Sequence, residues 1–319
     1  MGSEMCIRDS SLSCALWKDD LLAPASTSLK VEEQRRKFGP YHLTSEVLST
    51  GSIFTEGEHI FINNTHPDLS KAWESFFSIL EYVDHEFYNS SMIVLRDFPV
   101  DNPYNALLHD QGFVKANMPD SCVFTNFNWK SPGEFPDILS RRSRRHFFKD
   151  IASFKDKFSV KINSGVEESM LYIFESLYEN VRLNNPGLNT FPFPESLFEK
   201  MNENPNWEFI ILTLEGEWTE SKSAEVVGVM FCYKNLNITY VPEFVGMDYR
   251  YTREFNVYRQ LLYQTILRAA QLNFKKIDFG LTASFEKRKL GATVIPKVCY
   301  IQAKDNFSLE LLEIMQTSK

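Results

Sequence analysis

Cysteine is scarce in this chain, and its five copies form no recognisable pattern. None of them stands in a C-x-x-C pair, and an odd number of widely spaced cysteines fits neither a disulfide framework nor a zinc ribbon. The six histidines also lack the spacing of metal ligands. We therefore expect no metal site and a reducing, cytoplasmic location.

Long apolar runs are absent as well. No stretch approaches 18 consecutive apolar residues, so the sequence predicts a soluble protein without a transmembrane segment. The first ten residues, MGSEMCIRDS, lack the apolar core of a targeting peptide and resemble a translated sequencing-adapter fragment. We expect residues 1–31 to form a disordered tail.

Familiar catalytic motifs are missing too. The sequence has no G-x-S-x-G, H-E-x-x-H, Walker A or G-x-G-x-x-G motif, so hydrolase, zinc-protease, nucleotide-kinase and dinucleotide-binding functions lose their usual support. Basic residues are outnumbered by acids, 34 to 42, which gives a net charge of −8. Any polyanionic ligand would therefore have to meet a local basic patch.

Apolar and aromatic residues are plentiful, at 43% and 14% of 319 residues, and can bury a large core. In the first half, residues 68–82 have the apolar spacing of a helix, while residues 90–98 and 120–129 have the composition of strands. This alternation predicts an α/β layer. Lys130–Asp137, with two prolines and a glycine, is the predicted linker.

The second half is expected to continue the alternation. Its predicted elements are helix 138–154, strand 158–163, helix 167–183, strands 207–216, 225–235 and 237–249, helix 256–272 and strand 275–280. Pro242 predicts a bulge or an edge position within its strand. Asn256 stands at the N-cap position of the last helix.

Arginine gathers in the segment RRSRRHFFK, residues 141–149. On a helix, Arg141 and Arg145 share one face and could grip a phosphate. A solvated basic face, or ion pairs with some of the 42 acids, is the alternative. A nucleic-acid surface is a third interpretation of the same segment.

Two further segments could carry chemistry. A bulge at Pro242 would leave backbone N–H groups able to polarise a carbonyl, although packing is the commoner role of tyrosines in a strand. The possible acids and bases near it are Tyr240, Glu243, Asp248, Tyr249 and Tyr258. The other segment, KKIDFGLTASFEKRKLGA, combines the strand-end acid Asp278 with a basic cluster, and a lysine-rich surface loop is its alternative.

The order of these segments resembles the acyltransferase half of Fem-type proteins, which are members of the GNAT superfamily of acyl-CoA N-acyltransferases. The similar segments are LSRRSRRHFFKDI, GLNTFPFPESLF, EVVGVMFCY, YVPEFVGMDY, NVYRQLLYQTILRAAQLNFKKIDFG and FEKRKLGA, within Ile138–Ala303. The preceding half, from MIVLRDF to DSCVF, resembles the degenerate first unit of such tandem proteins. The resemblance implies an α/β fold of tandem GNAT-like units, 32–136 and 137–319, with a mixed central sheet flanked by helices.

The resemblance also implies a place for the cofactor. Residues Tyr249–Tyr258 fall where GNAT enzymes hold the pantetheine and pyrophosphate of acyl-CoA at a helix N-terminus. The usual glycine-containing loop is replaced by RYTREFNVYR, which has no glycine but offers cations. The implied cofactor-binding residues are Arg141, Arg145, Arg250, Arg253, Asn256 and Arg259.

The implied reaction is direct attack of an amine on the acyl carbonyl, without a covalent enzyme intermediate. Backbone N–H groups near Pro242–Val245 would hold the oxyanion, and Lys287, which matches the lysine of the F-K-x-x-F/L-G signature, would stabilise negative charge. The implied catalytic residues are Glu243 or Asp248 as the base, Tyr258 and Lys287. The implied substrate-binding residues are Asn189, Phe191, Tyr240, Tyr249 and Asp278, of which Asp278 would fix its loop.

Donor and acceptor stay open at this stage. An acyl thioester of CoA or of an acyl carrier protein is favoured over the aminoacyl-tRNA that some Fem-type proteins use, because the acidic net charge opposes tRNA binding. Similar modules accompany pyridoxal-phosphate-dependent oxoamine synthases, which suggests a long-chain or lipid amine as acceptor and such a synthase as partner. A cell-wall precursor is the other acceptor. A catalytically inactive GNAT-like binding module is the remaining alternative.

Overall fold

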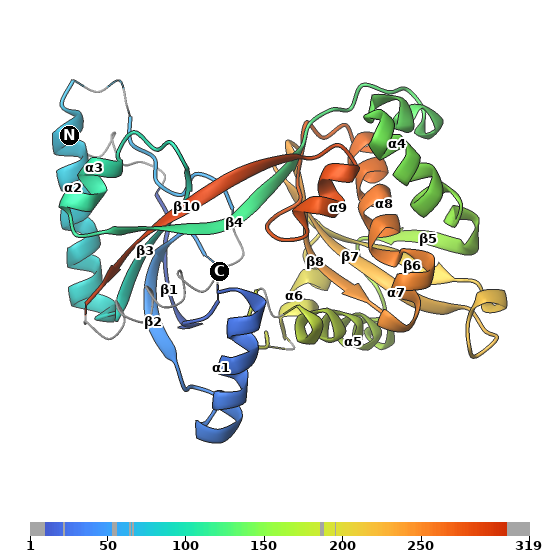
Figure 1. Cartoon of the computed structure of the whole chain (residues 1–319), viewed down its shortest axis with the longest axis horizontal. Coiled ribbons are helices and arrows are strands. Elements are labelled where there is room, and N and C mark those ends of the chain that lie inside the picture. Colours follow the sequence, from blue (N-terminus) through green and yellow to red (C-terminus); the bar gives the residue numbers. More distant parts are fainter. Residues whose placement is uncertain are drawn as a thin grey trace. The chain divides into compact units, whose positions relative to one another are not determined.

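The computed structural model describes residues 10–21, 23–52, 56–63, 65, 67–185, 188–194 and 196–304 (Figure 1). The chain forms two compact units. Unit 1 consists of Met1–Pro119, Pro186–Phe191 and Pro296–Lys319, and unit 2 consists of Asp120–Asn185 and Pro192–Ile295. No helix in the described ranges has the length and apolarity that crossing a membrane requires.

The elements of the two units follow in chain order. Unit 1 contains β1 (Leu12–Lys18), α1 (Ala25–Phe38), β2 (Thr44–Thr50), α2 (Leu69–Val83), β3 (Met92–Pro99) and α3 (Asn105–Asp110). Two strands, β4 (Val114–Phe124) and β10 (Thr293–Ala303), have residues in both units. Unit 2 contains α4 (Arg141–Phe147), β5 (Phe158–Asn163), α5 (Glu168–Asn184), α6 (Ser196–Glu203), β6 (Trp207–Leu214), β7 (Glu225–Asn235), β8 (Thr239–Met247), α7 (Tyr249–Phe255), α8 (Val257–Gln271), β9 (Lys276–Asp278) and α9 (Ser284–Lys289).

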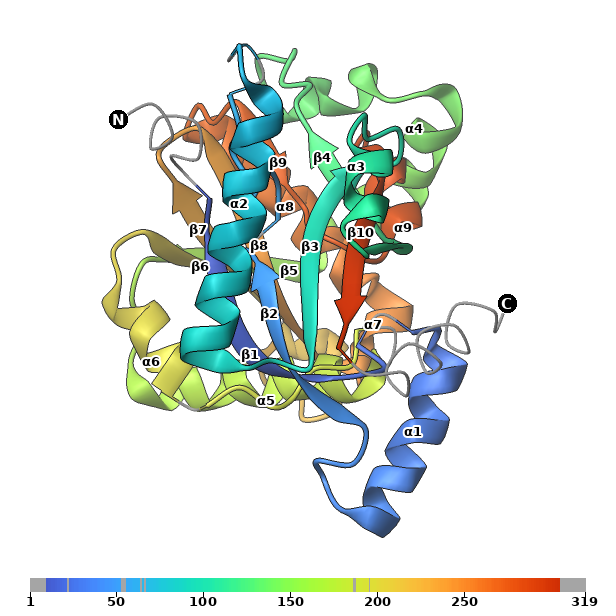
Figure 2. The same ribbon diagram turned by 90° about the vertical axis from the view of Figure 1, so that its left-hand side faces the viewer.

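In unit 1, β2 pairs with β1 in antiparallel and with β3 in parallel orientation, and β3 pairs with β10 in antiparallel orientation. Helix α2 covers one face of these strands, as Figure 2 shows. Its buried residues Trp73, Phe76 and Leu80 recur at helical spacing and pack with Leu95 and Tyr300. The predicted helix 68–82 is confirmed, and Asp68 caps it by accepting the N–H of Lys71.

The expected disordered tail over residues 1–31 is wrong for its described part. Strand β1 pairs along its whole length with β2, and Trp17 and Val31 are buried. Hydrogen bonding and burial of this kind offset the entropy lost on ordering the chain. The adapter-like residues 1–9 lie outside the described residues.

In unit 2, the strands lie in the order β4, β9, β8, β7, β6, β5. The β8–β9 pair is parallel and the other pairs are antiparallel, so the predicted mixed sheet is confirmed. Both faces of β6 are buried: Phe209 and Ile211 contact the cluster with α5, whereas Ile210 and Leu212 contact the cluster with α8. In Figure 1, α5 and α8 accordingly lie on opposite sides of these strands.

Two glycines let these helices pack closely on the sheet. A Cβ atom at Gly246 of β8 would lie 2.8 Å from the Cβ of Leu177 and from the backbone N of Tyr178 in α5. A Cβ atom at Gly228 of β7 would lie 2.8 Å from a methyl carbon of Val257 in α8. Larger residues at either position would push a helix away from the sheet.

The predicted linker is not a linker. Residues Pro132–Ile138 form a 3-10 helix, and Phe135 is fully buried in the core of unit 2, with its ring against those of Trp129, Phe147 and Tyr263. A Pro- and Gly-rich composition signals a change of direction, and burial of this aromatic side chain anchors the turn within the unit. The units divide between residues 119 and 120 instead.

Candidate functional site

Strand β8 carries the bulge that Pro242 predicts. In its ladder with β7, Phe231 is opposite Phe244 and Cys232 is opposite Pro242, so Glu243 is an additional residue. The described ladder between β8 and β9 contains only Thr239 and Tyr240, whereas the ladder with β7 continues to Met247. The two parallel strands therefore stop pairing just before the bulge.

Strand β8 leads into α7 through Asp248. The carboxylate of Asp248 caps the helix by accepting the backbone N–H of Arg250 at 2.9 Å, and it also accepts hydrogen bonds from the guanidinium, the shortest at 2.6 Å. Both carboxylate oxygens are thus engaged by Arg250. This engagement opposes the predicted role of Asp248 as a free general base.

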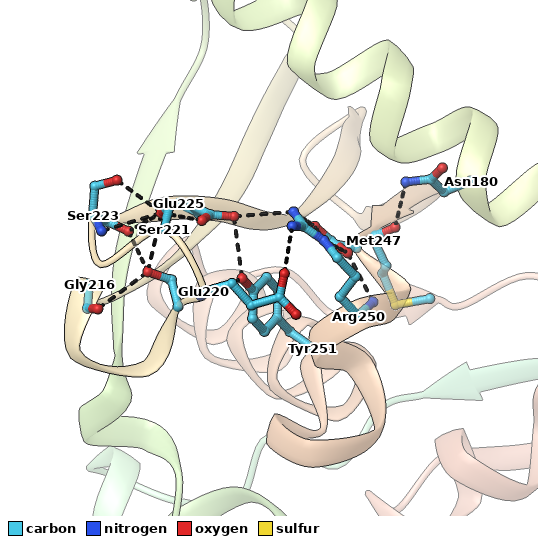
Figure 3. Close-up of polar contacts among 11 residues, drawn as sticks. Asn180, Gly216, Glu220, Ser221, Ser223, Glu225, Met247, Arg250 and Tyr251 are labelled. Atoms are coloured by element: carbon cyan, nitrogen blue, oxygen red, sulfur yellow. Dashed lines mark hydrogen bonds and ion pairs between the residues drawn. The ribbon is translucent and has the colours of Figure 1, made fainter.

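Arg250 is surrounded by acids (Figure 3). Its guanidinium also lies 3.2 Å from Glu225, the first residue of β7, and 3.5 Å from Glu220 in the β6–β7 connection. The hydrogen bond to Asp248 and the neighbouring negative charges raise the pKa of Arg250. The hydroxyl of Tyr251 accepts the backbone N–H of Glu220 at 3.0 Å, which fixes this loop against α7. Three carboxylates around one guanidinium leave an excess of two negative charges.

A groove of about 640 Å³ lies beside this cluster within unit 2. Its lining residues are Tyr172, Ile173, Ser176, Leu177, Asn180 and Asn184 of α5, Val226 of β7, and Asp248, Tyr249 and Arg250. The side-chain amide of Asn180 donates to the carbonyl of Met247 at 3.4 Å and thereby links α5 to the end of β8 (Figure 3). Burial raises the pKa of Tyr249, so its hydroxyl stays protonated at neutral pH.

A second polar cluster lies at the N-terminus of α8. Arg259 donates to Glu286 of α9 at 2.6 and 3.0 Å and lies 3.3 Å from Asp150. Arg259 also donates to the side chain of Asn256, which occupies the predicted cap position but makes no side-chain bond to the helix N–H groups. The hydrogen bond from Arg259 lowers the pKa of Glu286. Lys289 donates to the same carboxylate at 3.2 Å.

Lys287 is buried and bound to main-chain oxygens. Its ammonium group donates to the carbonyls of Phe279, Gly280 and Leu281 at 2.6, 3.1 and 2.6 Å. Asp278 accepts the backbone N–H of Gly280 at 3.3 Å and lies 3.1 Å from Lys276. Both residues therefore hold the loop after β9, which is the role expected for Asp278 but differs from the catalytic role expected for Lys287.

The predicted tyrosines differ in accessibility. Tyr240 is fully buried and its hydroxyl donates to Glu208 at 2.6 Å, so it faces the core rather than a substrate. Tyr258 is half-buried on α8, and burial, together with the nearby Cys122 and Glu286, raises the pKa of its hydroxyl. Tyr258 therefore stays protonated near neutral pH.

The remaining predicted residues take no part in the hydrogen bonds and ion pairs of these clusters. Asn189 and Phe191 belong to unit 1, where the side chain of Asn189 donates to Asp20 and Glu32 at 2.7 and 2.8 Å. The ring of Phe191 lies 5.3 Å from the ammonium of Lys18. The predicted cations Arg141, Arg145 and Arg253 are exposed and form no ion pair within the described ranges.

The structure thus brings Asp248, Tyr249 and Arg250 together at the groove, and Asn256, Tyr258 and Arg259 together at the start of α8. Sequence reasoning missed the groove residues of α5 and the acids of the β6–β7 connection, because no local pattern distinguishes them from an ordinary amphipathic helix or a polar loop. No group of His, Cys, Asp and Glu side chains in the described chain has the arrangement of a metal site.

Comparison with known proteins reveals similarity in fold alone. No protein-family model matches the sequence, and no curated protein matches it either. The fold is similar to that of FemX, with a TM-score of 0.55, 12% identity, and coverage of 86% of this chain and 83% of that one. It is also similar to L-PGS from Bacillus licheniformis, with a TM-score of 0.52, 10% identity, and coverage of 85% and 84%. The chain therefore has a fold similar to those of FemX and L-PGS, as the order of its segments implied for FemX.

Proposed function

We propose that this protein is a GNAT-type N-acyltransferase, which moves an acyl group from a thioester of CoA or of an acyl carrier protein to an amine. The observation that carries the proposal is the separation of β8 from β9 next to the bulge at Glu243. A donor arm that contains amide groups can pair with such a strand as an extended peptide pairs with a sheet edge. The bulge would then offer irregularly arranged backbone groups to the thioester carbonyl.

The cations of unit 2 fit donor phosphates only in part. Arg250 and Arg259 are each held by at least two carboxylates, so binding a phosphate would require breaking those ion pairs. Arg141, Arg145 and Arg253 are exposed and without an ion pair in the described part of the chain, which makes them the better candidates. When bound, acyl-CoA would supply an activated thioester carbonyl.

The chemical step needs one base and one proton donor. The amine nitrogen forms a bond to the thioester carbonyl carbon, the carbon–sulfur bond breaks, and the sulfur leaves as a thiol. We assign removal of the amine proton to Glu243 at the bulge, and delivery of a proton to the departing sulfur to Tyr258, whose raised pKa keeps the hydroxyl protonated. Lys287 holds the loop after β9, and Asp248 caps α7.

The test is thiol release by the purified full chain from a panel of acyl-CoA donors, with and without amine acceptors. We expect release that depends on the amine. Replacement Glu243→Gln should lower kcat on the order of a hundredfold or more in protein that still unfolds cooperatively. Absence of thiol release with every donor and acceptor, together with no thermal shift on adding CoA, would refute the proposal.

A further inference from the structure

We propose that the groove between α5 and the β8–α7 junction is a separate binding site for an organic cation with an apolar body, such as an arylalkyl or alkyl ammonium. The inference goes beyond the proposed transfer reaction and does not depend on it. The groove, its acidic end and its apolar wall all lie within unit 2.

The wall of the groove carries three exposed apolar or aromatic side chains. Tyr172, Ile173 and Tyr249 keep 61%, 41% and 40% of their surface accessible to water, although each is a large apolar or aromatic residue. Removing such surface from water is favourable, by roughly 25 cal/mol per Å². The volume of about 640 Å³ is in the ordinary range of small-molecule sites.

The end of the groove selects positive charge. Arg250 contributes one cation, but Asp248, Glu225 and Glu220 surround it, and its guanidinium is engaged by them. An anionic ligand would meet the excess negative charge, whereas an ammonium group would be attracted by it. The rings of Tyr172 and Tyr249 line the same groove and offer faces that favour a cation.

The polar stripe on α5 supplies acceptors. The side-chain nitrogen of Asn180 donates to Met247 and that of Asn184 donates to the carbonyl of Asn180. With both amide nitrogens engaged as donors, the oxygens of these side chains are the groups that can accept hydrogen bonds from an ammonium. The donor and acceptor pattern of the groove thus agrees with its charge.

The groove is closed off from the bulge on this face of β8. Gly246 lies against Leu177 and Tyr178 so closely that no side chain fits there, and the ring of Phe244 packs on that of Tyr178 at 5.5 Å. A ligand in the groove therefore cannot extend along this face to Glu243. For this reason we assign the groove to a second ligand rather than to the reacting amine.

Calorimetric titration of the full chain with three small probes tests the inference. The probe 2-phenylethylammonium carries both the apolar body and the charge, 3-phenylpropionate carries the body with the opposite charge, and methylammonium carries the charge alone. We expect 2-phenylethylammonium to bind on the order of tenfold or more tightly than either comparator, with an affinity that falls as salt is raised. Equal binding of 3-phenylpropionate would overturn the inference.

Variants place the binding in the groove. Ser176→Trp fills the groove from its exposed position on α5 and should abolish binding, while Ser169→Trp, exposed on the same helix but outside the groove, should leave binding unchanged. The double variant Glu220→Gln, Glu225→Gln removes charge without adding bulk and should weaken binding on the order of tenfold. Unchanged binding in the double variant would also overturn the inference, even if Ser176→Trp fails to fold.

Discussion

At the scale of single residues, Lys287 makes a direct prediction about stability. Replacement Lys287→Met removes three hydrogen bonds and leaves the carbonyls of Phe279, Gly280 and Leu281 without this donor in a buried place. We expect the free energy of unfolding to fall by about 2–4 kcal/mol in urea denaturation. The matched control Arg288→Met changes an exposed neighbour on α9 and should have little effect. Full stability with lost activity would instead return Lys287 to a catalytic role.

Glu208 makes a prediction about pH. Burial raises the pKa of this carboxyl, but hydrogen bonds from Arg268 and Tyr240 outweigh burial, and the folded-state pKa lies below the ordinary value of 4.5. A depressed pKa contributes stability that is present above the unfolded value and lost as the pH falls through the folded one. Glu208→Gln should therefore destabilise the protein at pH 7, and its difference from the unchanged protein should shrink below pH 4.5. A difference that is constant between pH 7 and pH 3 would contradict this assignment.

Which residues carry charge was readable from the sequence, but their partners were not. The strand-end position of Asp248 and Arg250 followed from the pattern of apolar residues. The acids that neutralise Arg250 come from positions 30 and 25 residues earlier in the chain, and only the pairing of β7 with β8 brings them together. Which residues form ion pairs across neighbouring strands depends on the register of strand pairing, and a local sequence motif does not determine that register.

At the scale of elements, Gly246 predicts how α5 is seated on β8. The added Cβ atom of Gly246→Ala would collide with backbone atoms of α5, which cannot rotate away, so the helix must shift. We expect a loss of about 1–3 kcal/mol in the free energy of unfolding. Gly133→Ala is the control, since the hydroxyl oxygen of Ser131 lies 4.0 Å from the added Cβ atom. Thermal melts of both variants decide the matter, and equal melting temperatures would refute the close contact.

The helices α2, α5 and α8 were predictable because apolar residues recur at helical spacing along each of them. The strands β6 and β7 were predictable as short apolar runs, because both of their faces are buried. The elements β1 and α1 were missed because the adapter-like start led us to exclude the residues that follow it. The segment around Phe135 was misassigned because proline and glycine content says where a chain turns but not whether the turn is buried.

At the scale of the whole molecule, the division of the chain into two units predicts which fragment folds by itself. A fragment of residues 120–295 contains all residues of unit 2 and should unfold cooperatively in a circular-dichroism melt. A fragment of residues 137–295, which starts at the boundary expected from the sequence, lacks the β4 residues that pair with β9 and also lacks the buried Phe124 and Phe135. Losing two buried phenylalanines removes about 3–5 kcal/mol each, a large part of a marginal stability. Identical melts of the two fragments would contradict this division.

The similarity in fold to FemX was predictable although sequence identity to FemX is only 12%. What carried the prediction was the order of segments, because a fold constrains where strands and helices follow one another more strongly than it constrains single residues. The catalytic assignments relied on single residues instead. A charged residue assigned to catalysis can equally well hold a loop or cap a helix. Lys287 and Asp248 illustrate this difference.

The loop held by Lys287 has a consequence for comparing related sequences. Gly280, Thr282 and Ala283 have left-handed backbone angles, with φ of 69°, 63° and 46°, and such angles are unfavourable for residues other than glycine. An ammonium bound to the carbonyls of this loop stabilises an otherwise costly conformation. Retention of this lysine across distant homologues would therefore reflect selection for the backbone conformation of the loop, even in homologues without catalytic activity. Its replacement would be tolerated where glycine takes the positions of Thr282 and Ala283.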